Sequence, residues 1–337
     1  MPLAQFSRRL LLAAAATVAM VAPAAAAEVV NIYNSRHYGT DQQLWAAFTK
    51  ETGIEVLSLT DKEGPLLAKL KAEGANTPAD VLLTVDAGNL WAAANAGLLK
   101  PVQSTTLNAN IPAHLRDPGN MWFGLSVRAR TIFFNKIKLK SSDLSTYEDL
   151  ANPKWKGKLC LRTSKKVYNQ SLVGMLIEEH GEAQTEQIVK GWVANLATDP
   201  LPDDTKLLEA IAAGQCDVGI ANTYYYGRLI EQKKNLPLGL FWANQQAGGT
   251  HVNISGAGVT RYAKNEKAAI KLIEWMSSDK AQNLVADINL EYPANPKVKA
   301  DPLVASWGTF KQNQINVNKA GENQVAATKL MDRAGYR

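Results

Sequence analysis

The first hundred residues alternate apolar segments with amphipathic ones, and this alternation limits the fold more than any other feature of the chain. Three strand-like segments are each followed by a helical pattern, with strands at 29–33, 54–59 and 81–85 and helices at 40–53, 65–74 and 86–97. Parallel strands are joined by helical crossovers, and strands covered on both faces are apolar throughout. The sequence therefore predicts an α/β fold with mixed, mostly parallel sheets flanked by helices.

Two longer strand-like stretches, 121–135 and 251–259, surround a second series of strands and helices. We interpret them as crossing strands that join two lobes, the first of which is completed by chain that returns to it. Lobes joined in this way close around a ligand by hinge motion. We expect an N-terminal lobe of residues 28–128 and 253–300 and a C-terminal lobe of residues 129–252 and 301–337.

The N-terminal residues have the pattern of an export signal. Arg8 and Arg9 precede the apolar stretch 10–21, which is followed by small residues at 24–27. This pattern predicts a signal peptide of residues 1–27, whereas a membrane anchor would need about 20 apolar residues. The paired arginines indicate either twin-arginine export or an ordinary basic segment. Because no cysteine stands at the cleavage site, we expect a free periplasmic protein.

Composition argues against several classes of partner. The chain is 46% hydrophobic and 20% charged, as soluble globular proteins are. Loss of the signal, whose only charges are Arg8 and Arg9, lowers the formal net charge from +6 to +4. Lysine and arginine are scattered along the chain, so we expect neither a nucleic-acid nor a membrane-surface footprint, and we expect a monomer.

Short enzyme motifs are missing. The sequence contains no GxSxG, HExxH, P-loop or CxxC pattern, and the fragment 256–258 lacks the third glycine of a dinucleotide site. This favours a binding protein over an enzyme. The only cysteines, Cys160 and Cys216, lie in predicted strands of the C-terminal lobe.

In an oxidising compartment such a pair favours a disulfide, with two buried thiols as the alternative. A periplasmic hydrolase or redox enzyme would need one of these cysteines as a reactive thiolate in the folded protein. Two cysteines alone are too few for a structural zinc site, which takes four protein ligands.

Phenols and one imidazole follow the ends of three predicted strands. Ligands bind beyond the carboxyl ends of strands in open α/β sheets, so we expect these side chains to line one cleft. Taken singly, each also fits a packed or surface aromatic residue. The residues are His37 and Tyr38 after the first strand, Tyr168 after the strand of Cys160, and Tyr224, Tyr225 and Tyr226 after the strand of Cys216.

A cleft lined by phenols without a carboxylate cluster favours a hard, highly charged cation. The pKa of Tyr is near 10, so one phenolate at pH 7 costs about 4 kcal/mol and four cost about 16 kcal/mol. Ferric iron offsets this cost better than a divalent ion, and its binding releases protons. A sugar cleft would favour Trp with Asp or Asn, and an oxyanion cleft Arg with Ser or Thr.

The chain resembles the periplasmic ferric-iron-binding proteins of ABC importers over essentially all of its mature length. The segments that carry the likeness are 34–38, 78–86, 222–225 and 249–258. The resemblance implies a type II periplasmic-binding-protein fold. It also implies a set of Fe³⁺ ligands from both lobes, namely His37, Tyr38, Tyr168, Tyr224 and Tyr225. Arg128 is similar to a family arginine close to the metal, and Tyr226 extends the tyrosine pair as a neighbour of the ligands.

The resemblance further implies delivery of Fe³⁺ to an iron ABC permease in the inner membrane, without covalent chemistry. Some relatives add a carbonate or carboxylate anion at the metal, and five protein ligands leave at most one position for it. The alternative is a binding protein for a small organic or oxyanion solute of the thiamine, phosphonate or polyamine type. Phenolate-to-iron charge transfer would colour an iron-binding protein, so colour distinguishes it from a binding protein for an organic or oxyanion solute.

Overall fold

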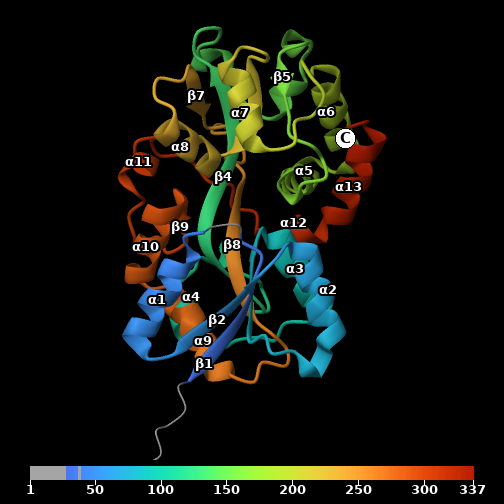
Figure 1. Cartoon of the computed structure of the whole chain (residues 1–337). Coiled ribbons are helices and arrows are strands. Elements are labelled where there is room, and N and C mark those ends of the chain that lie inside the picture. Colours follow the sequence, from blue (N-terminus) through green and yellow to red (C-terminus); the bar gives the residue numbers. More distant parts are fainter. Residues whose placement is uncertain (1–27, 37–38) are drawn as a thin grey trace, which may run out of the picture.

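The computed structural model describes residues 28–36 and 39–337, which form two lobes joined by two long strands (Figure 1). His37, Tyr38 and the predicted signal peptide lie outside these residues. The two joining strands are β4 (Phe123–Asn135) and β8 (Val252–Val259). They confirm the expected crossing strands, although the sequence predicted slightly longer ones.

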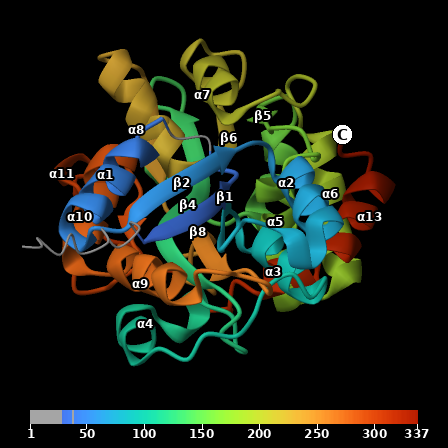
Figure 2. The same cartoon turned by 60° about the horizontal axis from the view of Figure 1, so that its bottom comes forward.

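The N-terminal lobe, at the bottom of Figure 1, is built on β1, β2, β3, β8, β9 and the first part of β4. Its other strands are β1 (Val29–Asn34), β2 (Glu55–Thr60), β3 (Val81–Val85) and β9 (Tyr292–Pro293). Helices cover both faces, with α1, α9 and α10 on one side of β1 and β2 and with α2 and α3 on the other (Figure 2). The helices are α1 (Asp41–Thr52), α2 (Glu63–Glu73), α3 (Ala87–Asn95), α4 (Thr105–Asn110), α9 (Glu266–Met276) and α10 (Asp279–Asn289).

The C-terminal lobe is built on the second part of β4 with β5 (Leu159–Cys160), β6 (Val218–Asn222) and β7 (Leu238–Phe241). One core packs α5, α6 and α13 against this sheet, and a second packs α7 and α8 against its other side. The helices are α5 (Val167–His180), α6 (Glu182–Ala194), α7 (Asp204–Ala212), α8 (Thr223–Gln232) and α13 (Gln324–Arg333). The short helices α11 (Pro302–Ala305) and α12 (Lys319–Glu322) precede α13 along the chain.

The sheet is mixed, as the sequence predicted, but its parallel share is smaller than expected. Parallel pairing joins β1 to β2, β1 to β3 and β5 to β6. The crossing strands β4 and β8 run antiparallel to each other and to β3, β6, β7 and β9. Parallel pairing is less frequent than expected because the two crossing strands, β4 and β8, run opposite to the strands beside them.

Strand β4 changes partners at one position. Residues from Phe123 to Ala129 pair with β8, and residues from Arg130 to Phe134 pair with β6. All thirteen residues of β4 are buried. The junction between the lobes therefore falls between Ala129 and Arg130 on this strand.

The predicted disulfide is confirmed, since Cys160 and Cys216 are bonded at an S–S distance of 2.08 Å. Both residues are buried in the core that packs α7 and α8. The predicted positions in strands hold only for Cys160, because β6 begins at Val218 and Cys216 lies in the turn before it. The bond therefore links the end of β5 to the segment just before β6.

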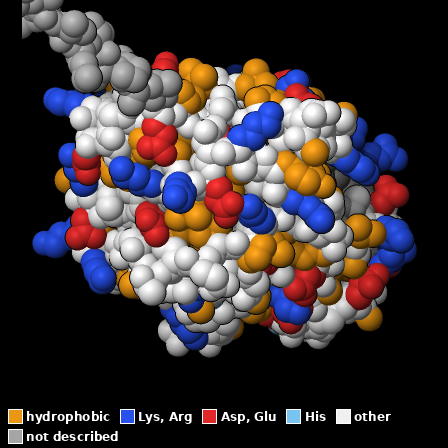
Figure 3. Space-filling view, turned by 90° about the horizontal axis from the view of Figure 1, so that it is seen from below, with side chains coloured by type: hydrophobic (Ala, Val, Ile, Leu, Met, Phe, Trp, Pro, Cys, Tyr) orange, Lys and Arg blue, Asp and Glu red, His pale blue; other side chains and the backbone are white. Residues whose placement is uncertain are grey.

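The surface agrees with the charge pattern of the sequence. On the face seen from below the N-terminal lobe, basic and acidic side chains are interspersed (Figure 3). Among the described residues, no helix has both the length and the apolar character that a membrane crossing demands.

Candidate metal centre

Three of the predicted tyrosines meet at the cleft face of the C-terminal lobe. Tyr168 lies in the first turn of α5, and Tyr224 and Tyr225 lie in the first turn of α8. The hydroxyls of Tyr224 and Tyr168 are 3.2 Å apart, and the ring centroids of Tyr224 and Tyr225 are 4.3 Å apart. Side chains separated by 56 residues in sequence thus form one cluster. Tyr168 follows the strand of Cys160, as the sequence predicted, but it lies within α5, which begins at Val167.

The cluster opens into a cleft of about 700 Å³ between the lobes. Tyr225, Arg162 and Lys166 line the cleft from the C-terminal lobe. The N-terminal lobe contributes Ser35, Arg36 and residues 60–65. His37 and Tyr38 are outside the described residues, but the chain that leads to them, through Ser35 and Arg36, lies at this cleft.

Four cations surround the phenols. Three lie over the ring of Tyr168, with Lys166 Nζ at 4.9 Å and the guanidinium carbons of Arg128 and Arg162 at 5.5 Å from the ring centroid. Arg228 lies 5.0 Å from the ring centroid of Tyr224. The sequence predicted only Arg128 of these four. A basic residue close in sequence to each tyrosine was the available signal, and Lys166 and Arg228 both have it.

Burial raises the pKa of the Tyr168 phenol, and the neighbouring Tyr225 raises it further. Arg128, the hydrogen bond with Tyr224 and Arg162 oppose this rise. Without a metal the phenol therefore keeps its proton at neutral pH. Once a cation displaces that proton, the surrounding positive groups stabilise the phenolate.

A buried contact joins the two lobes next to the tyrosine cluster, and we refer to it as the floor. Ser171, one turn after Tyr168 on α5, donates a 2.6 Å hydrogen bond to Asp86 Oδ1 at the start of α3. The other carboxylate oxygen of Asp86 is 4.0 Å from Arg128 Nη2. Burial raises the pKa of Asp86, while Arg128 and the hydrogen bond from Ser171 oppose the rise. The two lobes therefore touch through a polar contact that water does not reach.

The mouth of the cleft has a different interlobe contact. Lys166 Nζ lies 3.0 Å from Glu63 Oε1, and the two side chains are 24% and 30% exposed. Glu63 is the first residue of α2, in the N-terminal lobe. This ion pair therefore bridges the lobes at the edge of the solvent.

Tyr226 belongs to a different environment from its two neighbours. Its ring packs against Phe133 and Trp307, with centroid distances of 5.2 and 5.7 Å. Burial raises the pKa of its phenol. The helical turn therefore sends Tyr226 to an aromatic packing site beside the cluster.

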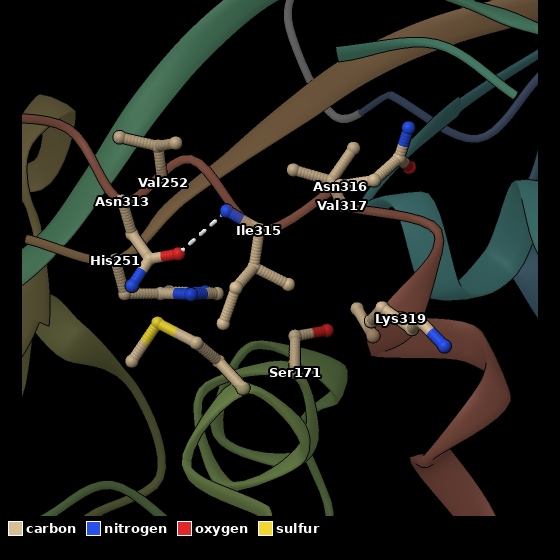
Figure 4. Close-up of a pocket in the computed structure, with 10 residues that line it drawn as sticks. Ser171, His251, Val252, Asn313, Ile315, Asn316, Val317 and Lys319 are labelled. Atoms are coloured by element: carbon tan, nitrogen blue, oxygen red, sulfur yellow. Dashed lines mark hydrogen bonds between the residues drawn. The ribbon is translucent and has the colours of Figure 1, made fainter. Parts of the chain in front are cut away.

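A small cavity of about 10 Å³ lies where β8 enters the C-terminal lobe (Figure 4). His251, Asn313, Ile315 and Ser171 line it, and Asn313 accepts a 2.9 Å hydrogen bond from the amide of Ile315. Burial lowers the pKa of His251 to about 3, with the charges of Arg130 and Arg128 adding to the effect. The imidazole is therefore neutral at physiological pH.

Two lobes joined by crossing strands, with a polar cleft between them, define a solute-binding protein. Residues 76–312 match the family model described as bacterial extracellular solute-binding protein. The chain belongs to this family.

Named relatives agree with this assignment. Iron uptake protein A1 of Synechocystis sp. is 47% identical, with 91% of this chain and 87% of that protein covered. The structure of the Trichodesmium protein IdiA (FutA) in complex with iron and citrate ligands has 47% identity and a TM-score of 0.89, and it covers 92% of this chain and 100% of its own. The Fe(3+)-binding periplasmic protein of Serratia marcescens is 28% identical over 96% of each chain.

Proposed function

We propose that this chain captures ferric iron in the cleft between its lobes and delivers it to an ABC permease, without covalent chemistry. The observation that carries the proposal is the 3.2 Å contact between the buried hydroxyls of Tyr168 and Tyr224, next to Tyr225 and ringed by cations. His37 and Tyr38 would complete the ligand set from the N-terminal lobe. The relatives named for iron uptake and ferric iron binding support the same cargo.

The chemistry of the cluster fits a trivalent ion. Burial keeps the Tyr168 phenol protonated, so the metal must displace that proton, and a strongly acidifying ion does this best. Arg128, Arg162 and Lys166 then offset the negative charge of the phenolates.

We also propose the processing and lobe boundaries that the sequence predicts. Export would remove residues 1–27 and place the protein in the periplasm, with Arg8 and Arg9 directing the twin-arginine route. The lobes would divide at 128/129 and 252/253. The change of partner along β4 falls one residue later, between Ala129 and Arg130, and supports a division near the first of these points. The chain would return to the C-terminal lobe at residues 301–337, and the packing of Leu330 and Met331 in the core of that lobe supports this.

One other group among the described residues could hold a metal ion. It consists of Glu148 together with Glu179 and His180 at the end of α5, about three turns from Tyr168. Asn244 donates to both carboxylate oxygens of Glu148, and Asn313 donates to Glu179, so hydrogen bonds already use these acceptors. Iron held by this group would lack phenolate charge transfer, so colour distinguishes the two sites.

Metal analysis and a visible spectrum of protein purified without added metal test the proposal. We expect one iron per chain and a phenolate-to-iron charge-transfer band, which Tyr225→Phe should shift or abolish. Bound iron without that band would move the site to the Glu148 group. A colourless protein that retains an organic solute and takes up no added Fe³⁺ would favour the alternative of a small organic or oxyanion ligand.

A further inference from the structure

Arg130 stands where the two lobes join. Its amide donates a 3.0 Å hydrogen bond to the carbonyl of His251, just before β8 begins, and it is the first residue of β4 to pair with β6. Tyr147 reinforces this point, since its hydroxyl donates to the Arg130 carbonyl at 2.6 Å and accepts from the His251 amide at 3.1 Å. The main chain of Arg130 thus holds the two crossing strands together.

The side chain of Arg130 reaches the two helix starts that carry the tyrosines. Its Nε and Nη2 donate to Asn169 Oδ1 at 3.0 and 2.7 Å, and Asn169 directly follows Tyr168. Its Nη1 donates to Asn222 Oδ1 at 3.0 Å, and Asn222 precedes the helix α8 that bears Tyr224 and Tyr225. One guanidinium therefore contacts both segments that form the phenol cluster.

Both asparagines use their side-chain oxygens on Arg130. Asn222 occupies the N-cap position of α8, and its side chain makes no capping hydrogen bond while its Oδ1 accepts from Arg130. The Asn169 amide nitrogen donates to the carbonyls of Arg162 and Thr163, which ties the loop before α5 to the same network. Arg130 and its partners thus link the starts of both helices in one hydrogen-bond network.

Asp204 completes the network as the counter-ion. Its Oδ2 accepts from Arg130 Nη1 at 3.0 Å and from the Asn222 amide at 3.1 Å. The side chains of Arg130 and Asp204 are 2% and 0% exposed. A buried pair of this kind adds little net stability compared with apolar residues, so its geometric role explains it better than stability does.

We propose that Arg130, neutralised by Asp204, is a positioning residue that fixes Tyr168, Tyr224 and Tyr225 relative to one another and fastens them to the hinge. This inference rests on the proposed capture of iron by these tyrosines. The guanidinium has five donors in a planar fork, and an ammonium group cannot reach two asparagines and a carboxylate in the same directions. The charge alone is therefore not sufficient for the role.

The substitution Arg130→Lys tests the proposal because it keeps the charge opposite Asp204 and removes the fork. We expect a folded protein that retains one bound iron, with an iron affinity about 10- to 100-fold lower, the range found when partners of metal ligands are removed. We also expect a shifted charge-transfer band, because the phenolate geometry changes. Affinity is measured by competition with a chelator, and folding by thermal unfolding of the metal-free protein.

Asn135→Ala is the matched control. Asn135 is a buried polar residue of the same strand, and its side chain bonds the carbonyl of Ile211 and the amide of Ile137, away from the tyrosines. This variant should lose stability but keep the wild-type affinity and spectrum. Wild-type affinity and spectrum in Arg130→Lys, or equal losses in both variants, would overturn the proposal.

Asn169→Ala keeps the test decisive if Arg130→Lys fails to fold. It removes the acceptor beside Tyr168 and leaves the pair of Arg130 and Asp204 intact, so the band should again shift, and an unchanged band would refute the inference. A wild-type protein that binds no iron would instead remove the proposed function itself, and this outcome is distinct from the others.

Discussion

The floor and the mouth of the cleft join the same two lobes by opposite means. At the floor, Ser171 and Asp86 meet out of reach of water, with Arg128 close by. At the mouth, Lys166 and Glu63 form an ion pair that is about one quarter exposed. Hydrogen bonds to buried charged groups contribute about 1.5–3 kcal/mol, whereas exposed ion pairs contribute about 0–1 kcal/mol.

The difference indicates where closure is stabilised. The floor contact depends on exact placement of α5 against α3, and α5 also carries Tyr168 one turn away. The mouth contact tolerates movement and is screened by salt. We therefore expect the metal and the floor to determine the closed state, and the mouth to adjust it.

The largest expected effect comes from the phenols, of which Tyr168 and Tyr224 are buried and Tyr225 is partly buried. Tyr224→Phe and Tyr225→Phe each remove a phenolate and keep the ring. Each should lower Fe³⁺ affinity by more than about 100-fold, since even partners of metal ligands contribute up to that much. Chelator competition and the charge-transfer band measure the loss. Equal losses of Fe³⁺ affinity in Tyr224→Phe and Tyr225→Phe would show that the burial of a tyrosine does not determine how much it contributes to iron binding.

Two further variants serve as controls for this prediction. Tyr226→Phe should bind nearly as the wild type does, because its ring packs against Phe133 and Trp307. His37→Ala should keep the colour and much of the affinity, since the phenolates carry most of the attraction to the ion. Wild-type affinity and spectrum in both Tyr224→Phe and Tyr225→Phe would exclude these tyrosines as ligands.

The next effect concerns His251, behind the floor. Its pKa of about 3 in the folded protein lies below the value near 6.5 of an exposed imidazole. Below pH 6.5 His251 therefore binds a proton in the unfolded chain but stays neutral in the folded one. The free energy of unfolding consequently falls as the pH falls from about 6.5 towards 3. The loss should reach about 2 kcal/mol at pH 5.

Denaturant unfolding of the metal-free protein at pH 7 and pH 5 measures this loss. His251→Asn should show a smaller difference between the two pH values than the wild type does. An identical pH dependence in both proteins would assign the effect to other groups, such as His114, whose pKa burial also lowers.

Much of the architecture was predictable because it depends on local patterns. Short, mainly apolar segments identified the strands β1 and β3, and the length of the stretch at 121–135 identified β4 as a crossing strand. The family resemblance, carried by short motifs, is confirmed by the match to solute-binding proteins and by relatives named for iron. Strands β7 and β9 were missed, since their pairing with β4 depends on contacts distant in sequence.

The tyrosine cluster was predictable from the sequence, but its surroundings were not. Tyrosines after strands are visible in the sequence, and Tyr168, Tyr224 and Tyr225 do lie together, while their role as iron ligands stays a prediction. Arg128 lies beside the phenols, whereas Arg130, two residues later in the same strand, donates hydrogen bonds to Asn169 and Asn222. The local sequence does not distinguish these two arginines. That distinction arises only from the register between β4 and β6.

A smaller effect is expected from the floor contact. Ser171→Ala removes the 2.6 Å hydrogen bond to Asp86 and leaves the tyrosines in place. Iron affinity should fall about 10-fold, equivalent to about 1.4 kcal/mol, because this bond joins the two lobes and we expect it to break when they open. The charge-transfer band should stay at its wild-type position. A shifted band would mean that Ser171 acts on the geometry of the iron ligands. The contact at the floor would then not stabilise closure independently of the metal site.

The smallest effect is expected at the mouth, and it should depend on salt. Glu63→Gln removes the charge opposite Lys166 and is preferable to a change at Lys166, which also lies over the ring of Tyr168. The free energy of iron binding should weaken by less than about 1 kcal/mol at low ionic strength. At about 1 M salt the Debye length is near 3 Å, so wild type and variant should converge. Chelator competition at both salt concentrations measures the difference, with Glu51→Gln as the control, because Glu51 pairs with Lys280 within the N-terminal lobe. A loss as large as that of Ser171→Ala that persists at high salt would show that the mouth stabilises closure as strongly as the floor does.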